Sequence, residues 1–300
     1  MIPPELAGLR LALREEVLLS GRTTLRIGGP ARWLAEVEDG GALAAVIRWA
    51  RSERLPVLPI GKGSNVLIPD EGFPGVAIVL SGDFRKVEVR GTRIVAGGGA
   101  SLVSLADQAG RAGLSGLEGL SGIPSSVGGA VRINAGSYGS EIFDVLDSVE
   151  VVSRAGEERE VPASEIPHGY RWTALVESGD VVVSASMRLR RDDPAAVRAR
   201  MAEVAAKRKK ASPSRPNAGS IFRNPPGDYA GRLLEHAGMK GRRSGRAEVS
   251  PVHANVIVNL GGATARDVRE LMAEMRRAVV ERFGVELVPE IEVLPSASVE

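Results

Sequence analysis

The sequence contains no cysteine, and only three of its 300 residues are histidine. Without cysteine the protein has no disulfide, no thiol nucleophile, and no thiolate ligand for zinc or an iron–sulfur cluster. His168, His236 and His253 lie far apart in the chain, so we expect no histidine-rich site and no bound metal. If the protein is an enzyme, its chemistry falls to a borrowed cofactor and to hydroxyl, carboxyl and guanidinium groups.

Long apolar runs are also absent. The opening segment, MIPPELAGLRLALREEV, interrupts its apolar residues with charges and lacks the apolar core of a signal peptide. No segment approaches the roughly 20 consecutive apolar residues that cross a bilayer. With no cysteine either, the sequence predicts a cytoplasmic protein that does not insert into membranes.

Neither sign of charge dominates the sequence. It has 39 lysine and arginine residues against 37 aspartate and glutamate residues, a net charge of +2. A charge balance this even is not by itself a sign of nucleic-acid binding. Hydrophobic residues make up 43% of the chain and charged residues 25%, which are ordinary values for a globular protein and exclude a mainly disordered one.

The hydrophobic spacing switches between the period of strands and the period of helices. The last helix has the clearest signals, because Thr264 and Asp267 form a capping box before it and Gly284 follows it. The irregular order of elements favours an α+β fold over a doubly wound sheet. Helices are predicted at residues 41–52, 101–112, 195–210, 229–237 and 265–283. Strands are predicted at residues 31–37, 55–60, 76–80, 86–90, 93–96, 147–153, 181–190, 255–260 and 285–294.

A chain of 300 residues is about twice the usual domain length, so we expect two domains. Asp193-Pro194 opens a charged helix, and we place the boundary before it, near residue 192. The first domain then covers residues 1–192, in two parts over 1–60 and 61–192. The second covers residues 193–300 and contains the final strand.

Two glycine-rich loops follow apolar strands, GKGSN at residues 61–65 and GIPSSVGGA at residues 122–130. Glycine permits positive φ and close backbone approach, so that successive N–H groups can converge on an anionic oxygen. Neither loop matches the dinucleotide fingerprint or the P-loop. Either loop alone is also explained as a simple turn, but the pair fits a long diphosphate ligand better than a single phosphate.

Several further motifs stand in a fixed order around these loops. The first half carries TTLRIGGPA at residues 23–31 and extends the second loop to GIPSSVGGAVRINAGSYGSEI. The second half carries Tyr170-Arg171, NAGSIFRNP at residues 217–225, and Pro289-Glu290-Ile291. Together these motifs resemble the UDP-N-acetylenolpyruvoylglucosamine reductase family, flavoenzymes of peptidoglycan precursor synthesis. No long insertion follows Pro225, so the sequence is similar to the shorter, type II subtype of that family.

The resemblance implies a fold and a reaction. It implies an N-terminal FAD-binding unit of the vanillyl-alcohol-oxidase/PCMH type, made of two α+β subdomains, and a C-terminal α+β substrate-binding domain. The final strand is expected to return toward the flavin. The implied reaction is the NADPH-dependent reduction of UDP-N-acetylglucosamine enolpyruvate to UDP-N-acetylmuramate on non-covalent FAD. A nucleotide sugar would then be the partner, with no nucleic acid and no obligate protein partner.

The resemblance also marks Arg171, Ser220 and Glu290 as the catalytic residues. Ser220 matches the proton donor, which needs a positive field and exclusion of water, although a serine after glycine is often a turn residue. Arg171 would hold the substrate carboxylate; the alternative interpretation is that it is an ordinary surface arginine. Glu290 lies beside Val288 and Ile291, which suggests a partly buried, protonated carboxyl; a solvent-facing strand position is the alternative.

The same resemblance assigns FAD-binding contacts to both glycine loops and to Asn134-Ala135-Gly136, which follow the second loop. The predicted FAD-binding residues are Gly61, Lys62, Gly63, Ser64, Asn65, Gly122, Ile123, Pro124, Ser125, Ser126, Gly128, Gly129, Asn134, Ala135 and Gly136. The predicted substrate-binding residues are Tyr170, Arg215 and Asn224.

Two other functions are compatible with parts of the sequence. An oxidase on the same FAD scaffold would react with oxygen, and often holds its flavin on histidine or cysteine, which the two loops lack. A nucleotide- or nucleic-acid-binding protein would use the basic residues at 207–215, although such a run is more often a solvated helix end. That protein would be colourless and its affinity strongly salt-dependent. The visible spectrum before and after NADPH separates the three.

Overall fold

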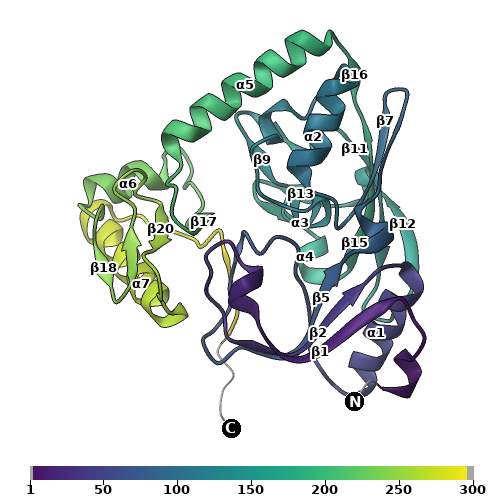
Figure 1. The fold of residues 1–300 in the computed structure, drawn as a ribbon. Helices are drawn as coiled ribbons and strands as arrows, with labels where there is room; N and C mark the ends of the chain where they lie inside the picture. Colours follow the sequence, from purple (N-terminus) through teal and green to yellow (C-terminus); the bar gives the residue numbers. More distant parts are fainter. Residues whose placement is uncertain (1–2, 296–300) are drawn as a thin grey trace. The chain divides into compact units, whose positions relative to one another are not determined.

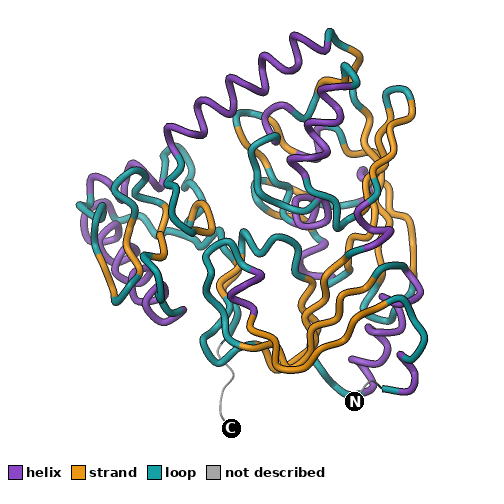
Figure 2. Tube along the Cα trace, viewed as in Figure 1, coloured by secondary structure: helices purple, strands orange, loops and turns teal. Residues whose placement is uncertain are grey.

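The computed structural model describes residues 3–295, and these divide into two compact units. Unit 1 consists of the chain up to Glu15 together with Trp33–Lys62 and Gly75–Arg208, and unit 2 consists of Glu16–Arg32, Gly63–Pro74 and the chain from Lys209 onward. Both units mix helices and strands, as Figure 2 shows, which confirms the predicted α+β class.

The first layer of unit 1 is a four-stranded sheet covered by one helix (Figure 1). The order of its strands is β1 (Leu11–Leu18), β2 (Pro30–Val37), β5 (Phe73–Leu80) and β3 (Val57–Pro59), and β3 pairs with β5 in parallel. Helix α1 (Gly40–Ser52) begins at Asp39, whose carboxylate accepts from the N–H of Ala42 at 2.9 Å. Its apolar face is buried in the same core as β5.

The second layer of unit 1 is a five-stranded antiparallel sheet. The order of its strands is β12 (Glu158–Pro162), β11 (Leu146–Val152), β15 (Val181–Arg188), β7 (Arg93–Gly97) and β6 (Val87–Arg90). Helices α2 (Leu102–Arg111) and α3 (Val127–Arg132) share its core, and α4 (Leu175–Ser178) is a single turn before β15. Short strand pairs complete this layer: β8 (Leu114–Ser115) with β16 (Arg190–Arg191), β9 (Gly136–Ser137) with β10 (Ser140–Glu141), and β13 (His168–Gly169) with β14 (Trp172–Thr173).

Unit 2 is built on a four-stranded sheet in the order β17 (Asn217–Ser220), β20 (Val256–Asn259), β19 (Ala247–Val249) and β18 (Arg243–Ser244). Helices α6 (Ala230–His236) and α7 (Ala265–Phe283) bury their apolar faces in its core. A second pair joins β21 (Glu292–Val293) to β4 (Val66–Leu67) in parallel. The capping box and the left-handed Gly284 predicted for α7 are both present.

Helix α5 (Pro194–Ala211) explains why the units divide at Arg208 rather than near residue 192. Its only buried residue, Val197, belongs to the first turn and is 1% exposed. One turn later, Arg200 forms ion pairs with Glu118 at 2.8 Å and with Asp192 at 2.6 Å. The first half of α5 therefore packs within unit 1. Unit 1 includes the helix as far as Arg208, and unit 2 resumes at Lys209.

The strand predicted at residues 285–294 is mostly wrong, because only Glu292–Val293 has strand structure. The predicted strand at residues 55–60 shortens to Val57–Pro59. Several elements lack a prediction, among them the short strands and also β1 and α3. Strand β1 carries charges on a largely exposed stretch, which hides its alternation. Helix α3 has six residues, two of them glycine, which is too short and too glycine-rich for a helical period to show.

Candidate cofactor site and catalytic residues

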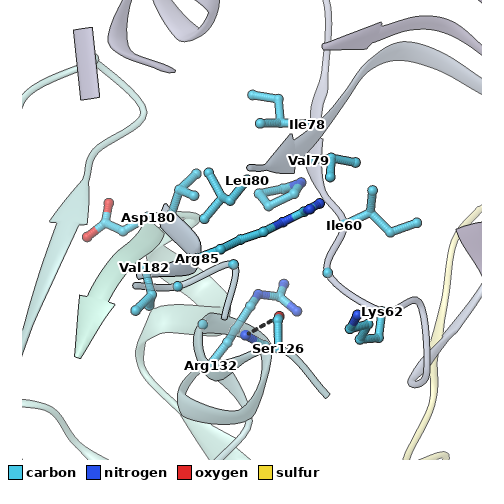
Figure 3. Close-up of a pocket in the computed structure, with 17 residues that line it drawn as sticks. Ile60, Lys62, Ile78, Val79, Leu80, Arg85, Ser126, Arg132, Asp180 and Val182 are labelled. Atoms are coloured by element: carbon cyan, nitrogen blue, oxygen red, sulfur yellow. Dashed lines mark hydrogen bonds between the residues drawn. The ribbon is translucent and has the colours of Figure 1, made fainter. Parts of the chain in front are cut away.

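A pocket of unit 1 collects residues from both layers and from both glycine loops (Figure 3). Its walls combine apolar strand residues, backbone at glycine, and a few polar side chains. The apolar and proline residues are Pro59, Ile60, Ile78, Val79, Leu80, Val181 and Val182. The glycines are Gly61, Gly98, Gly99, Gly128 and Gly129, and the polar residues are Lys62, Arg85, Ser126, Arg132 and Asp180.

Glycine is required at several of these positions by the close approach of other chain segments. A methyl group on Gly98 would collide with the carbonyl oxygen of Val182, and one on Gly61 with the hydroxyl of Ser126. A methyl group on Gly99 would lie 2.5 Å from the carbonyl oxygen of Leu80. Because no side chain fits there, backbone forms this part of the pocket wall.

The two glycine loops have different hydrogen-bonding capacity. In the second loop, the N–H groups in the first turn of α3 already have protein acceptors. Val127 N–H donates to the carbonyl oxygen of Ala100, Gly128 N–H to that of Gly98, and Gly129 N–H to the hydroxyl of Ser126. In the first loop, within the described part of the chain, the N–H groups of Gly61 and Lys62 have no protein acceptor. The first loop can therefore donate to an anion, whereas the second shapes the wall.

Positive charge surrounds the same pocket. Figure 3 shows Lys62, Arg85 and Arg132 around one opening, beside the apolar strand residues. The one carboxylate in the wall, Asp180, is 6% exposed and pairs with Arg159 at 2.5 Å. Unused backbone donors and cations suit the diphosphate of FAD, and the apolar wall suits its rings, so the residues present fit this cofactor.

The pocket brings together five of the predicted FAD-binding residues: Gly61, Lys62, Ser126, Gly128 and Gly129. Four others lie in the second loop but do not line this pocket: Gly122, Ile123, Pro124 and Ser125. Three more belong to unit 2: Gly63, Ser64 and Asn65. Asn134, Ala135 and Gly136 are buried after α3 and also do not line it.

Several wall residues were missed by the sequence reasoning. The run Gly97-Gly98-Gly99 directly after a predicted strand was the available signal for a third glycine segment. Arg85, Arg132 and Asp180 also line the pocket, and none of them was among the predicted binding residues.

Arg171 lies in the turn of the hairpin formed by β13 and β14, with φ of +56°. Its guanidinium donates to the carbonyl oxygen of Gly136 at 2.6 Å, and it lies 5.3 Å from the ring centre of Tyr170. Burial lowers the pKa of the Arg208 guanidinium, Tyr138 opposes that shift, and nearby Arg171 adds to it. Two guanidinium groups therefore share one region of unit 1, which favours an anion there.

Ser220 and Glu290 are brought close along the backbone of unit 2. Ser220 ends β17 beside a bulge, after the left-handed Gly219. The N–H of Glu290 donates to the carbonyl oxygen of Ile221 at 2.8 Å. The amide of Asn65, a predicted FAD-binding residue, donates to the carbonyl oxygen of Glu290 at 3.2 Å. Residues from three separate sequence motifs therefore meet in this unit.

The predicted substrate contacts fall in both units. Tyr170 belongs to unit 1, next to Arg171, and is 47% exposed. Asn224 and Arg215 belong to unit 2 and are exposed. The side-chain oxygen of Asn224 accepts from the N–H of Ala230 at 3.1 Å, so it also fixes the start of α6. Of Val288 and Ile291, the apolar neighbours of Glu290, only Ile291 is buried.

Comparison with known proteins identifies the class. The model of the FAD binding domain matches residues 31–161, which confirms the predicted cofactor. A cholesterol oxidase from Brevibacterium sterolicum shares the fold, with a TM-score of 0.50 and 14% identity, over 64% of this chain and 40% of the oxidase. The chain therefore contains an FAD-binding domain, and the fold of this part is of the vanillyl-alcohol-oxidase/PCMH type.

Its family follows from more similar proteins. The C-terminal domain model of UDP-N-acetylenolpyruvoylglucosamine reductase matches residues 210–294. A protein of that name, numbered 2, from Symbiobacterium thermophilum is 44% identical over 94% of this chain and 92% of its own length. The one from Myxococcus xanthus is 43% identical over 91% of this chain and 89% of its own length. The crystal structure of the Thermus caldophilus reductase has a TM-score of 0.83 and 42% identity, covering 95% of this chain and all of that one. The chain belongs to the UDP-N-acetylenolpyruvoylglucosamine reductase family.

Proposed function

We propose that this protein reduces UDP-N-acetylglucosamine enolpyruvate to UDP-N-acetylmuramate, with NADPH as reductant, in the synthesis of peptidoglycan precursors. The observation that carries the proposal is family membership over nearly the whole chain, together with a unit 1 pocket that fits FAD. When bound, FAD supplies the relay that takes hydride from NADPH to the vinyl carbon of the substrate. The nucleic-acid interpretation has no support beyond the basic run at residues 207–215.

Arg171 acts on the substrate carboxylate in this proposal. Hydride addition to the vinyl group leaves negative charge that spreads onto the carboxylate, and a fixed guanidinium stabilises it. The nearby Arg208 adds to the positive field, as the effect of Arg171 on the Arg208 pKa indicates. The hydrogen bond to Gly136 fixes one arm of the Arg171 guanidinium before substrate binds.

Ser220 supplies the proton that completes the reduction. A hydroxyl group is a weak acid, so it transfers a proton only to a carbon with carbanion character and only where water is excluded. Glu290, in its protonated form, donates a hydrogen bond to the same developing charge. The overall balance is one hydride from NADPH and one proton from the protein, which solvent later replaces.

The division of labour between the units is part of the proposal. The pocket supports FAD binding in unit 1, whereas the proposed nucleotide-sugar contacts are divided between Tyr170 in unit 1 and Asn224 and Arg215 in unit 2. The expected domains at residues 1–192 and 193–300, with the last strand returning toward the flavin, remain a prediction in this form.

The remaining expectations concern location and partners. Among residues 3–295 no helix is long and apolar enough to cross a membrane. We infer a cytoplasmic enzyme from the lack of cysteine and from a nucleotide-sugar substrate. We also infer that it acts without nucleic acid and without an obligate protein partner.

Spectroscopy of the purified protein tests the function. We expect a yellow protein whose visible absorbance NADPH bleaches and the enolpyruvyl substrate restores, under nitrogen. A protein that oxygen recolours much faster than the substrate does would be an oxidase. A protein that binds no flavin even after FAD is added would overturn the proposal.

The Ser220→Ala variant tests the proton donor separately. Bleaching by NADPH should keep its wild-type rate, whereas recolouring by the substrate should slow by at least about a hundredfold, since a positioned acid contributes that much. Ser244→Ala, at a half-buried position on the edge strand β18 of the same unit, is the matched control and should leave both rates unchanged. Loss of bleaching in Ser220→Ala would contradict the proposed role.

A further inference from the structure

Asn134 is fully buried and has an unusual backbone, with φ of +45°. Its side-chain amide is engaged by the protein on both sides. The amide nitrogen donates to the Oε2 atom of Glu141 at 2.7 Å and to the carbonyl oxygen of Gly169 at 3.1 Å. The amide oxygen accepts from the N–H of Phe143 at 3.4 Å. These contacts leave the amide little capacity for a cofactor, although the sequence motif suggested one.

The partner Gly169 precedes the turn that carries Arg171. The hairpin is minimal, with Gly169 opposite Trp172 and only Tyr170 and Arg171 between them. A positive φ at an arginine is strained and persists only where the surroundings impose it. The hydrogen bond from Asn134 to Gly169 is one such constraint, at the first strand of the hairpin.

Two further contacts tie the same hairpin to the segment around Asn134. The hydroxyl of Thr173, which is fully buried, donates to the carbonyl oxygen of Arg132 at 2.6 Å. The Arg171 guanidinium donates to Gly136, whose backbone pairs with Glu141. Residues on both sides of Asn134 therefore hold both strands and the turn of the hairpin.

We propose that Asn134 is a positioning residue for Arg171: its amide joins Glu141 to Gly169 and so fixes the strained turn that aims the guanidinium. The inference rests on the proposed function of Arg171 as the carboxylate-binding group. A displacement of about 1 Å at such a group can cost on the order of a hundredfold in rate. The effect should therefore fall on the step that uses the carboxylate and leave FAD binding and NADPH oxidation intact.

The isosteric Asn134→Asp variant provides the test, since it replaces both donated hydrogen bonds by repulsion from Glu141 and the Gly169 carbonyl. In the FAD-loaded enzyme we expect recolouring by the enolpyruvyl substrate to slow 10- to 100-fold. Bleaching by NADPH and the FAD content per chain should stay within about twofold of wild type. Equal slowing of both half-reactions, or none, would overturn the proposal.

A double-mutant cycle separates positioning from general damage. In an Arg171→Met background the Asn134→Asp change should cost less than about twofold further, because its effect passes through the guanidinium. Full additivity would refute the positioning role. If Arg171→Met itself recolours at the wild-type rate, the proposed function of Arg171 fails, which is a different outcome.

Two other variants keep the test valid if Asn134→Asp folds poorly. Thr173→Val removes the second hairpin contact with little change of shape and should slow the same half-reaction, again only where Arg171 is present. Ser148→Ala removes a buried hydrogen bond to Glu160 in the same unit, at 2.7 Å, and should affect stability alone. A Ser148→Ala enzyme as slow as Asn134→Asp would show that the effect is not specific to the hairpin.

Discussion

At the scale of single residues, the close approach of neighbouring backbone decides which pocket positions must be glycine. The glycine loops at residues 61–65 and 122–130 are visible in the sequence, and parts of both line it. Gly98 and Gly99 are equally necessary, and their only local signal is the run of three glycines after a predicted strand. Their constraint comes from the carbonyl oxygens of Val182 and Leu80, on strands that are distant in the chain.

Gly98→Ala tests this constraint. The new methyl group meets the Val182 carbonyl, so we expect a loss of about 1–3 kcal/mol in the free energy of unfolding and weaker FAD binding. Urea denaturation and fluorescence titration with FAD measure the two effects. Gly41→Ala is the matched control, because its methyl group has only an ordinary contact at 3.5 Å within α1. A Gly98→Ala protein with wild-type stability and affinity would refute the close packing.

His253 provides a pH test at the same scale. Burial lowers its pKa below the ordinary value of 6.5, and Lys240 lowers it further. The Nδ1 atom also accepts from the N–H of Asn255 at 3.2 Å, which requires that nitrogen to be unprotonated. Below about pH 6.5 the unfolded chain binds a proton that the folded protein resists, so stability falls as the pH drops toward the folded pKa.

We therefore expect wild type to lose more stability than His253→Gln between pH 7.5 and pH 5.5. One proton contributes at most about 1.4 kcal/mol per pH unit. Urea midpoints across this range measure the difference, and His236→Gln, at an exposed histidine, is the control. Parallel pH curves for wild type and His253→Gln would contradict the assignment.

At the scale of elements, the local signals perform well where an element is long and capped. Helix α7 was predicted with its true bounds because its capping box, its apolar stripe and Gly284 all depend on near neighbours. What the sequence does not show is that Asp70 also caps this helix. Its carboxylate accepts from the N–H of Ala265 at 2.7 Å and of Arg266 at 3.1 Å, from far away in the chain.

Cap variants of α7 measure both contributions. Thr264→Ala should cost about 1 kcal/mol of unfolding free energy, since one N–H loses its acceptor. Asp70→Ala should cost at least as much, because two N–H groups lose theirs. Arg276→Ala, at an exposed position within the helix, should change stability by less than about 0.5 kcal/mol. Urea denaturation distinguishes these cases, and a silent Asp70→Ala would show that the tertiary cap is dispensable.

At the scale of the whole molecule, the units are not contiguous in sequence. Residues 16–32 and 63–74 belong to unit 2, whereas the expected first domain ran unbroken to residue 192. The physical reason is that these segments bury Leu25, Ile27 and Leu67 in the core of unit 2. A pattern read along the chain identifies these residues as apolar, but it does not say which core receives them.

Ligand-linked stability tests the assignment of FAD to unit 1. FAD at a hundred times its dissociation constant should stabilise the apoprotein by about 2.7 kcal/mol, with exchange protection of amides around Gly61, Lys62 and Gly98. Riboflavin lacks the diphosphate and adenosine, so its stabilisation at the same concentration should be much smaller. Thermal unfolding and hydrogen exchange provide the measurements. Equal stabilisation by riboflavin, or protection confined to unit 2, would contradict the assignment.

Features that depend on neighbouring residues follow from the sequence alone: the α+β class, the capped helices, two glycine loops, the need for a borrowed redox cofactor and, through its motifs, the family. Features that depend on long-range contacts follow only from the folded structure. These are the third glycine segment of the pocket, the composition of the two units and the place of Asn134 beneath the Arg171 hairpin. Periodicity and capping act over a few residues, whereas these contacts form only when distant strands pair and close the chain around them.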